Sequence, residues 1–394
     1  MTKVLIYFTN FSTSLGGSEY LPLLFINWLQ KRNYVVTIAL DWKSDIECVS
    51  RLSGIPVDLS RLTVVYVKPK NHFFQRIDAI LPFYRVRQLK RLAKNSDVCI
   101  SAANMMDFGK PAHHFVYLMR HFGDNVFYDY VMHRGPLSGA VRLRRELRTC
   151  IAEYFLRPLL GVRSTRKILS DPREHIYPNS HYVEETMRNF YGQFKSTIFY
   201  PPTTFDFTMS KNVVRASMDV VCIGRIIPEK RVTDIIDIVE HARSISGYNI
   251  RLRIAGQLVP QTYYTEEIKR LASERGWIEL AGALYGDEKE NFLLSGTYAV
   301  HARRDEEFGI AVAEYLKAGL IPIVPDEGGG REVVDSQDLT YHVNEDAARL
   351  LVKLISDAVF RERIGAHCRN RAKMFSRSAY MVRQHKLLER IFRK

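Results

Sequence analysis

Short apolar runs alternate with amphipathic stretches along this chain, and the same alternation occurs twice. Short apolar runs separated by helical patterns are typical of a parallel sheet with helices on both faces. The strand-like runs cover residues 3–8, 34–40, 63–67, 97–101 and 114–118 in the first series, and 219–224, 250–256, 277–282, 298–302 and 320–324 in the second. The predicted fold class is therefore α/β, with two doubly wound domains.

One segment separates the two series. The 394 residues exceed what a single ordinary core accommodates. Within IFYPPTTFDFTMSKNV, the run Tyr200-Pro201-Pro202 can continue neither a helix nor a central strand. We place the hinge there, between a first domain of residues 1–203 and a second domain that begins at residue 204. Ligands bind at the carboxyl ends of parallel strands, so we expect functional motifs just after strands, in a cleft between the two domains.

Composition excludes several classes of protein. The 46% hydrophobic and 25% charged residues are typical of a globular domain. The five cysteines are odd in number and widely spaced, which argues against a disulfide framework and against a zinc site. The run Val4–Phe8 is too short for the core of a signal peptide, and no apolar stretch approaches the roughly 18 residues of a membrane span. We expect a cytoplasmic protein that does not cross a membrane.

The net charge of +14 indicates a phosphate-bearing partner. Basic residues gather in the segments 84–96 and 139–167, where arginines alternate with apolar residues. One interpretation is a pair of solvated surface helices whose arginines lie along them, and the other is a surface that rests on anionic lipid headgroups. Nucleic acid is disfavoured as a partner, because the chain has no surface of interleaved aromatic and basic residues for base stacking.

Two motifs follow strand-like runs. Gly16-Gly17 lies between the first strand and its helix, where glycine lets backbone N–H groups approach a phosphate or a sugar. The segment CIGRIIPEKRV places Arg225 and Lys230 on the loop after the first strand of the second domain. Two cations on one loop can both reach a diphosphate, although exposed basic residues are also common in so basic a chain.

The third motif is EEFGIAVAEYLKAGLIPIVPDEGGG. On a continuous helix the carboxylates of Glu306 and Glu314 would lie about 12 Å apart, which suits two parts of one extended ligand better than an acid and base acting on one bond. The N–H groups of Phe308-Gly309-Ile310 at a helix start suit a phosphate or an oxygen that gains charge. The glycines at 328–330 should leave room beside it. The segment is therefore predicted to cradle a nucleotide sugar.

The segments GRIIPEKR and EEFGIAVAE resemble, in this order and spacing, the donor-site motifs of retaining glycosyltransferases of the GT-B fold, family 4. That family has two glutamates separated by seven residues, which Glu306 and Glu314 match. The resemblance extends to LGGSE, YPNSHYV, YPP and the last segment, 376–394, which is similar to a closing helix that crosses back to the first domain. It implies two Rossmann-like domains, an acceptor domain of 1–203 and a nucleotide-sugar domain of 204–375. YPP and the glutamate motif also look like those of mannosyltransferases that build lipid-linked oligosaccharides on the cytosolic membrane face.

The resemblance implies a role for each motif. Arg225 and Lys230 would hold the donor diphosphate, and Glu306 would bind sugar hydroxyls beside the amides of Phe308, Gly309 and Ile310. Further donor contacts would come from Gly16, Gly17, Gly256, Leu284, Tyr285 and, at the ribose, Glu314. In RHFGD, His121 takes the place of a histidine near the reacting sugar, although a glycine, Gly123, stands where relatives have proline. His113 and His114 lie nearby as alternatives.

The implied reaction is hexosyl transfer from a nucleotide sugar with retention, without a metal or other cofactor. The first candidate is a mannosyltransferase that uses GDP-mannose and a polyprenyl-linked or glycan acceptor, peripheral at the inner face of the cell membrane. A second candidate uses a UDP-sugar to build a cell-surface polysaccharide. The third is a non-catalytic nucleotide-binding module, which is disfavoured because Arg225, Lys230 and Glu306 are all present.

Overall fold

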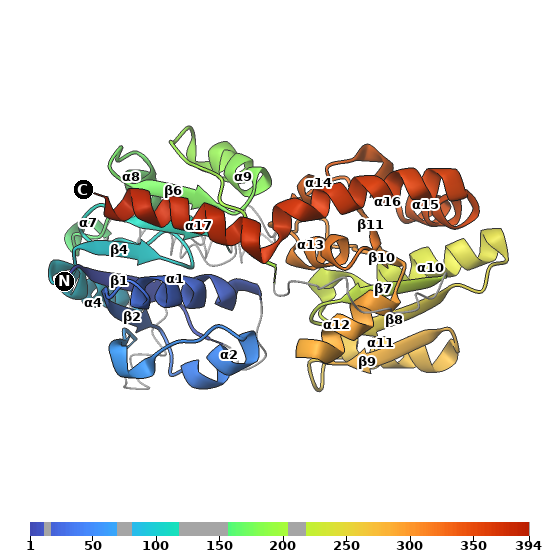
Figure 1. Cartoon of the computed structure of the whole chain (residues 1–394), viewed down its shortest axis with the longest axis horizontal. Coiled ribbons are helices and arrows are strands. Elements are labelled where there is room, and N and C mark those ends of the chain that lie inside the picture. Colours follow the sequence, from blue (N-terminus) through green and yellow to red (C-terminus); the bar gives the residue numbers. More distant parts are fainter. Residues whose placement is uncertain (12–16, 69–80, 118–156, 204–217, 394) are drawn as a thin grey trace, which may run out of the picture. The chain divides into compact units, whose positions relative to one another are not determined.

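The computed structural model of the chain describes residues 1–11, 17–68, 81–117, 157–203 and 218–393. They form two compact units, residues 1–200 and 201–394 (Figure 1). The division falls at Tyr200, inside the predicted hinge. The predicted return of residues 376–394 to the first domain stays a prediction.

The first unit contains a six-stranded parallel sheet in the order β3-β2-β1-β4-β5-β6. Its strands are β1 (Lys3–Phe8), β2 (Val35–Leu40), β3 (Leu62–Tyr66), β4 (Val98–Ser101), β5 (His113–Val116) and β6 (His175–Pro178). Its helices are α1 (Tyr20–Gln30), α2 (Ile46–Ser53), α4 (Leu81–Lys94), α7 (Arg157–Leu159), α8 (Thr165–Leu169) and α9 (His181–Tyr191), with 3-10 turns at Gly17–Glu19 and Leu59–Arg61. The strand β1 is buried along five of its six residues, as expected of a parallel strand covered on both faces.

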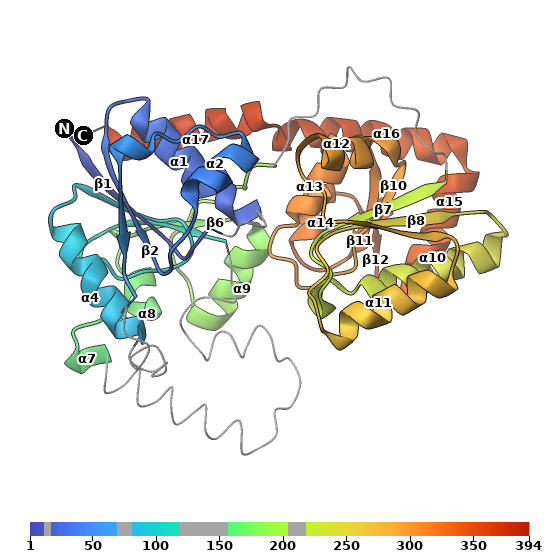
Figure 2. The same ribbon diagram turned by 90° about the horizontal axis from the view of Figure 1, so that it is seen from below.

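The second unit repeats this arrangement, with a parallel sheet in the order β12-β11-β10-β7-β8-β9 (Figure 2). Its strands are β7 (Asp219–Ile223), β8 (Arg251–Ala255), β9 (Ile278–Gly282), β10 (Tyr298–Val300), β11 (Ile321–Pro325) and β12 (Thr340–Tyr341). Its helices are α10 (Val232–Ser246), α11 (Tyr263–Glu274), α12 (Gly286–Ser295), α13 (Ile310–Lys317), α14 (Gly329–Val334), α15 (Asn344–Ser356), α16 (Ala358–Ala372) and α17 (Arg377–Phe392), with 3-10 turns at Pro228–Lys230, Gln337–Leu339 and Lys373–Phe375.

The predicted α/β class and its doubly wound sheets are confirmed. The ten predicted strands are present with ends shifted by at most a few residues. Sequence reasoning missed β6 and β12. The strand β6 has only four residues and includes a proline, and β12 has two residues, so neither makes a distinct apolar run.

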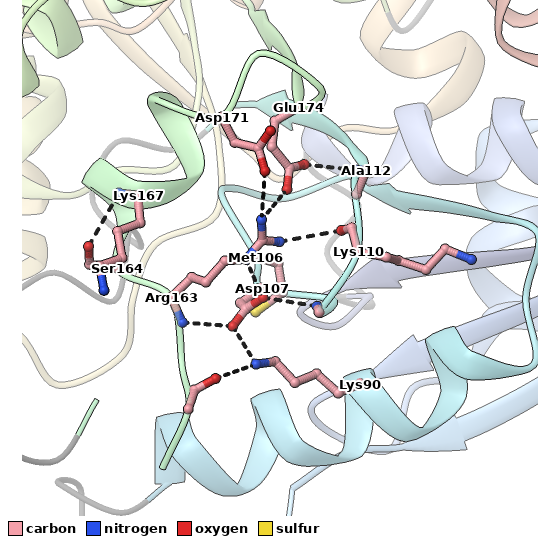
Figure 3. Close-up of polar contacts among 12 residues, drawn as sticks. Lys90, Met106, Asp107, Lys110, Ala112, Arg163, Ser164, Lys167, Asp171 and Glu174 are labelled. Carbon is pink, nitrogen blue, oxygen red and sulfur yellow. Dashed lines mark hydrogen bonds and ion pairs between the residues drawn. The ribbon is translucent and has the colours of Figure 1, made fainter. Parts of the chain in front are cut away.

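A buried ion-pair network ties the loops of the first unit together (Figure 3). The Asp107 carboxylate lies 2.8 Å from the Lys90 ammonium and 2.9 Å from Arg163 Nε. Arg163 also pairs with Glu174, at 2.8 Å, and Glu174 lies 2.9 Å from Nε2 of the buried His114. Because these residues come from α4, from the loop after β4, from the loop before α8 and from the β5–β6 region, the network joins segments that are far apart in sequence.

Asp107→Asn tests this network. Burial by itself would raise the pKa of the Asp107 carboxyl, but hydrogen bonds from Lys90 and Arg163 outweigh burial and lower it. Breaking a buried ion pair costs about 3–5 kcal/mol, and we expect about 2–3 kcal/mol here, because Lys90 and Arg163 keep roughly a quarter of their side chains in water. Urea unfolding at pH 7 measures the loss.

The same variant has a pH signature. A lowered carboxyl pKa contributes stability above the ordinary aspartate pKa, about 3.9, and this stability is lost as the pH falls through the lower folded-state value. The difference between wild type and Asp107→Asn should therefore shrink below about pH 4. Asp338→Asn is the control, since it removes an exposed pair with Arg363 and should cost well under 1 kcal/mol. Equal losses in the two variants would contradict the role of the network.

Candidate functional site

In the second unit, the loops after β7 and β10 lie side by side at the point where the order of the sheet reverses. The two strands are hydrogen-bonded neighbours, yet the chain leaves β7 toward β8 and β10 toward β11. A crevice at the carboxyl ends of the strands forms at such a switch point. Lys230 follows β7 and Glu306 follows β10, so topology brings together two residues that are 76 positions apart.

The Glu306 carboxylate is buried and paired. Its Oε2 accepts a 2.5 Å hydrogen bond from Lys230 Nζ and lies 3.3 Å from His301 Nε2, while its Oε1 is 3.6 Å from Arg303. Burial alone would raise the pKa of the Glu306 carboxyl, but Lys230, His301 and Arg303 hold it well below its usual range. Burial lowers the pKa of His301. At neutral pH the site therefore holds an ionised glutamate beside an uncharged imidazole.

Sequence reasoning missed His301, Arg303 and Glu307. The Arg303 guanidinium lies 3.0 Å from Glu307 and 3.1 Å from Asp305. Burial, with the like charge of Glu306, raises the pKa of Glu307 against the opposing effect of Arg303. The signal that could have found these residues is the run His301–Glu307, in which three basic side chains stand within six residues of two adjacent glutamates directly after a strand.

The second predicted carboxylate, Glu314, lies on α13 and is also buried. Both of its oxygens accept hydrogen bonds from Lys289 on α12, at 3.0 and 2.9 Å. The helix α12 begins directly after Leu284-Tyr285, which are among the predicted donor contacts. Glu306 and Glu314 thus pair with different lysines on different elements, and their service to two parts of one ligand stays a prediction.

The helix α13 begins where predicted, after Phe308-Gly309. Gly309 adopts φ +93°, a left-handed conformation that favours glycine, and no side chain caps the helix start. Phe308 is buried, and Ile310 is the first helical residue. The first turn of this eight-residue helix therefore lies next to the loop that carries Glu306, with its N–H groups directed toward that end of the helix.

The glycines at 328–330 are predicted to leave room beside the helix start. Instead, Gly328 and Gly329 permit close backbone packing. The Gly329 N–H donates a 2.6 Å hydrogen bond to the Glu306 carbonyl. A Cβ at Gly329 would lie 2.4 Å from Glu307 O, and one at Gly328 would lie 2.4 Å from Arg304 O. The run thus holds the main chain of Glu306 in place.

The other predicted donor residues follow strands at the same edge of this sheet. Arg225 is exposed after β7, and Leu284 and Tyr285 lie beyond β9. Gly256 directly follows β8, and its N–H donates to Gly282 O at 2.7 Å. A Cβ there would lie 1.7 Å from Gly224 O, so only glycine allows this approach of the two loops. Their roles toward a donor stay predictions.

In the first unit, Gly17 opens the 3-10 turn after β1, while Gly16 and His121 lie outside the described residues. His113 and His114 begin β5, where His113 is partly buried and His114 is fully buried. His113 stacks on His175 with 4.6 Å between ring centroids, and burial lowers its pKa to about 3. Both alternatives to His121 are therefore committed to the packing of the sheet.

The described part of the chain contains neither a candidate metal site nor a helix that could span a membrane. No group of three or more His, Cys, Asp or Glu residues could hold a metal ion there. None of the described helices has both the length and the hydrophobicity needed to cross a bilayer. The expectation of a reaction without a metal stays a prediction.

Residues 210–373 match the family described as glycosyl transferases group 1. A curated relative, the GDP-Man:Man(3)GlcNAc(2)-PP-Dol alpha-1,2-mannosyltransferase of Candida glabrata, is 26% identical over 164 residues, which cover 38% of this chain and 32% of that protein. The chain thus spans about a third of the length of this relative.

The fold matches solved glycosyltransferase structures over almost the whole chain. WaaG, a glycosyltransferase involved in lipopolysaccharide biosynthesis, superposes with a TM-score of 0.70 at 14% identity, covering 99% of this chain and 100% of WaaG. Anabaena Alr3699/HepE, solved in complex with UDP and glucose, gives 0.66 at 13% identity, with 99% and 100% coverage. The predicted GT-B fold is confirmed, and the match to the glycosyl transferases group 1 family lies within the second unit.

Gly329→Ala tests whether the glycine run positions Glu306. The new methyl group would meet Glu307 O and Phe308 Cα at 2.4 and 2.5 Å, so the loop must move. Overpacking of this kind costs about 1–3 kcal/mol. We expect a lower melting temperature, measured by calorimetry. Gly276→Ala is the control, because nothing lies within 4 Å of its Cβ position, and a similar loss there would contradict the packing role.

Proposed function

We propose that this chain, which has the GT-B fold and matches the glycosyl transferases group 1 family over residues 210–373, is a retaining glycosyltransferase that moves a sugar from a nucleoside diphosphate to an acceptor hydroxyl. The observation that carries the proposal is the buried, ionised Glu306 between Lys230 and His301 at the switch point. A carboxylate held in this way accepts hydrogen bonds from sugar hydroxyls in a fixed geometry.

The low pKa of Glu306 argues against a role as general base. A general base works best when its pKa is near the working pH, and that of Glu306 is held far below neutrality. Glu306 therefore orients the sugar and does not take a proton. The acceptor proton would pass to the departing phosphate oxygen as the new glycosidic bond forms on the same face of the sugar.

The charge that develops on the leaving β-phosphate needs cations and N–H donors. Arg225 and Lys230 supply cations from the loop after β7, and the start of α13 supplies N–H groups from the loop after β10. Glu314 binds the ribose hydroxyls, with Lys289 holding its carboxylate. Preorganised groups of this kind typically contribute a factor of about 10²–10³ each to the rate constant.

For the donor, we propose GDP-mannose, with a lipid-linked or glycan acceptor and a peripheral position at the inner face of the cell membrane. The mannosyltransferase relative, whose name includes GDP-mannose and a dolichol-linked acceptor, supports this choice. The second candidate is a UDP-sugar donor for a cell-surface polysaccharide, which the likeness to a structure that holds UDP and glucose favours.

A nucleotide screen tests the donor class. Purified chain is heated with GDP, UDP, ADP and dTDP, beside the variants Arg225→Ala and Glu314→Ala. A ligand at 100 times its dissociation constant stabilises the native state by about 2.7 kcal/mol. We expect a shift with GDP that both variants lose and that Arg349→Ala, an exposed arginine on α15, retains. A shift with UDP instead would select the second candidate, and no shift with any nucleotide would contradict the proposal.

Lys230→Met tests the leaving-group role. Loss of this cation should lower kcat by about 10²–10³, measured by product formation from the donor that the screen identifies. Lys269→Met on α11 is the matched control, since this lysine is exposed and pairs across the helix surface with Glu266. An unchanged kcat in Lys230→Met, with normal folding by circular dichroism, would remove Lys230 from the mechanism.

A further inference from the structure

The helix α4 separates its cations onto two faces. Phe83, Val86, Leu89 and Ala93 are buried, which defines the inner face. Arg87, Arg91 and Lys94 are exposed, at spacings of four and three residues, and therefore form one line along the outer face. The predicted basic segment 84–96 is thus a helix with a continuous cationic stripe.

The inner and outer cations have different surroundings. Arg85 lies 3.0 Å from Asp41, and Lys90 lies 2.8 Å from Asp107, so the two cations beside the inner face are neutralised. Among the described residues, no carboxylate pairs with Arg87, Arg91 or Lys94, and the segment from residue 81 to 96 contains no acid. The ion pairs of Arg85 and Lys90 stabilise the unit, which explains why these two cations are present. The three outer cations of the stripe make no such pair among the described residues, so stability does not explain them.

Two leucines that are exposed to solvent lie on the loop that contacts α4 through Lys90. Leu159, at the end of α7, is 81% exposed, and Leu160 is 53% exposed. Lys90 Nζ donates a 2.6 Å hydrogen bond to Gly161 O, and the Arg163 N–H donates a 2.8 Å hydrogen bond to Asp107 (Figure 3). The loop of residues 159–163, which carries both leucines, is therefore hydrogen-bonded to α4 through Lys90. The helices α4 and α7 lie close together in both views of the chain (Figures 1 and 2).

We propose that Arg87, Arg91, Lys94, Leu159 and Leu160 form a lipid-binding face that docks on an anionic bilayer. Cations at a membrane surface attract acidic headgroups, and exposed aliphatic side chains beside them enter the boundary between headgroups and acyl chains. A polyanion without an apolar layer would use the stripe but leave the two leucines in water. The inference deepens the proposed function and rests on it for its purpose, since it brings the first unit to the surface where a lipid-linked acceptor would lie.

Vesicle flotation of the full chain tests the face. We expect binding to vesicles of phosphatidylcholine that contain about 30% phosphatidylglycerol, a proportion chosen to give a strongly anionic surface. We expect little binding to vesicles of pure phosphatidylcholine. The triple variant Arg87→Gln, Arg91→Gln, Lys94→Gln should bind the anionic vesicles roughly 100-fold more weakly, at about fivefold per cation. The double variant Leu159→Ser, Leu160→Ser should lose about tenfold or more.

Matched variants elsewhere separate a defined face from general charge. Lys373→Gln, Lys386→Gln, Arg390→Gln removes the same three charges from exposed positions of the second unit. Val359→Ser, Val382→Ser removes two valines that are 82% and 54% exposed, close to the exposure of the two leucines. Both controls should bind anionic vesicles nearly as wild type does. Equal losses in test and control variants, or equal binding of wild type to both kinds of vesicle, would overturn the proposal.

Failure of this inference is distinguishable from failure of the proposed function. The variants of the lipid-binding face should keep the nucleotide-induced thermal shift, because none of the five residues belongs to the donor site. A chain that shows the shift but does not bind vesicles overturns the lipid-binding face alone. Vesicle binding that the variants lose, without any nucleotide shift, supports the face and contradicts the proposed reaction.

Discussion

A parallel sheet that is covered by helices on both faces leaves only its strand ends open to a ligand. Both sheets of this chain have that arrangement, with strand order reversing beside β1 in the first unit and beside β7 in the second. The helices occupy the faces because the strands are apolar on both sides, so polar residues gather in the loops that follow the strands. The position of the candidate site is thus a consequence of how the core is buried.

Burying charge at such an edge requires partners. Glu306 and Glu314 are both largely removed from water, and each has a lysine from another element within hydrogen-bonding distance. An unpaired buried carboxylate would take up a proton at considerable cost, whereas these pairs keep the charge and fix its direction. Asp107 in the first unit is also a buried carboxylate with cationic partners, and there the ion pairs hold loops together.

Glycine contributes through close packing of main chain more than through open space. At Gly256 and Gly329 a side chain would overlap backbone atoms of a neighbouring loop, and the N–H group of each donates a short hydrogen bond to that neighbour or to the next strand end. The loops that carry Arg225 and Glu306 are therefore positioned by backbone contacts.

The sequence alone determined the alternating elements, the break near Tyr200 and the placement of Lys230, Glu306 and Glu314 after strands or at a helix, because these follow from local periodicity and from the chemistry of short motifs. Only the tertiary structure decided which charges meet. Lys289 pairs with Glu314 across 25 residues, and α4 pairs Arg85 and Lys90 while leaving Arg87, Arg91 and Lys94 to solvent. The physical reason is that ion pairing depends on distances of a few ångströms between segments that the fold, and no local pattern, brings together.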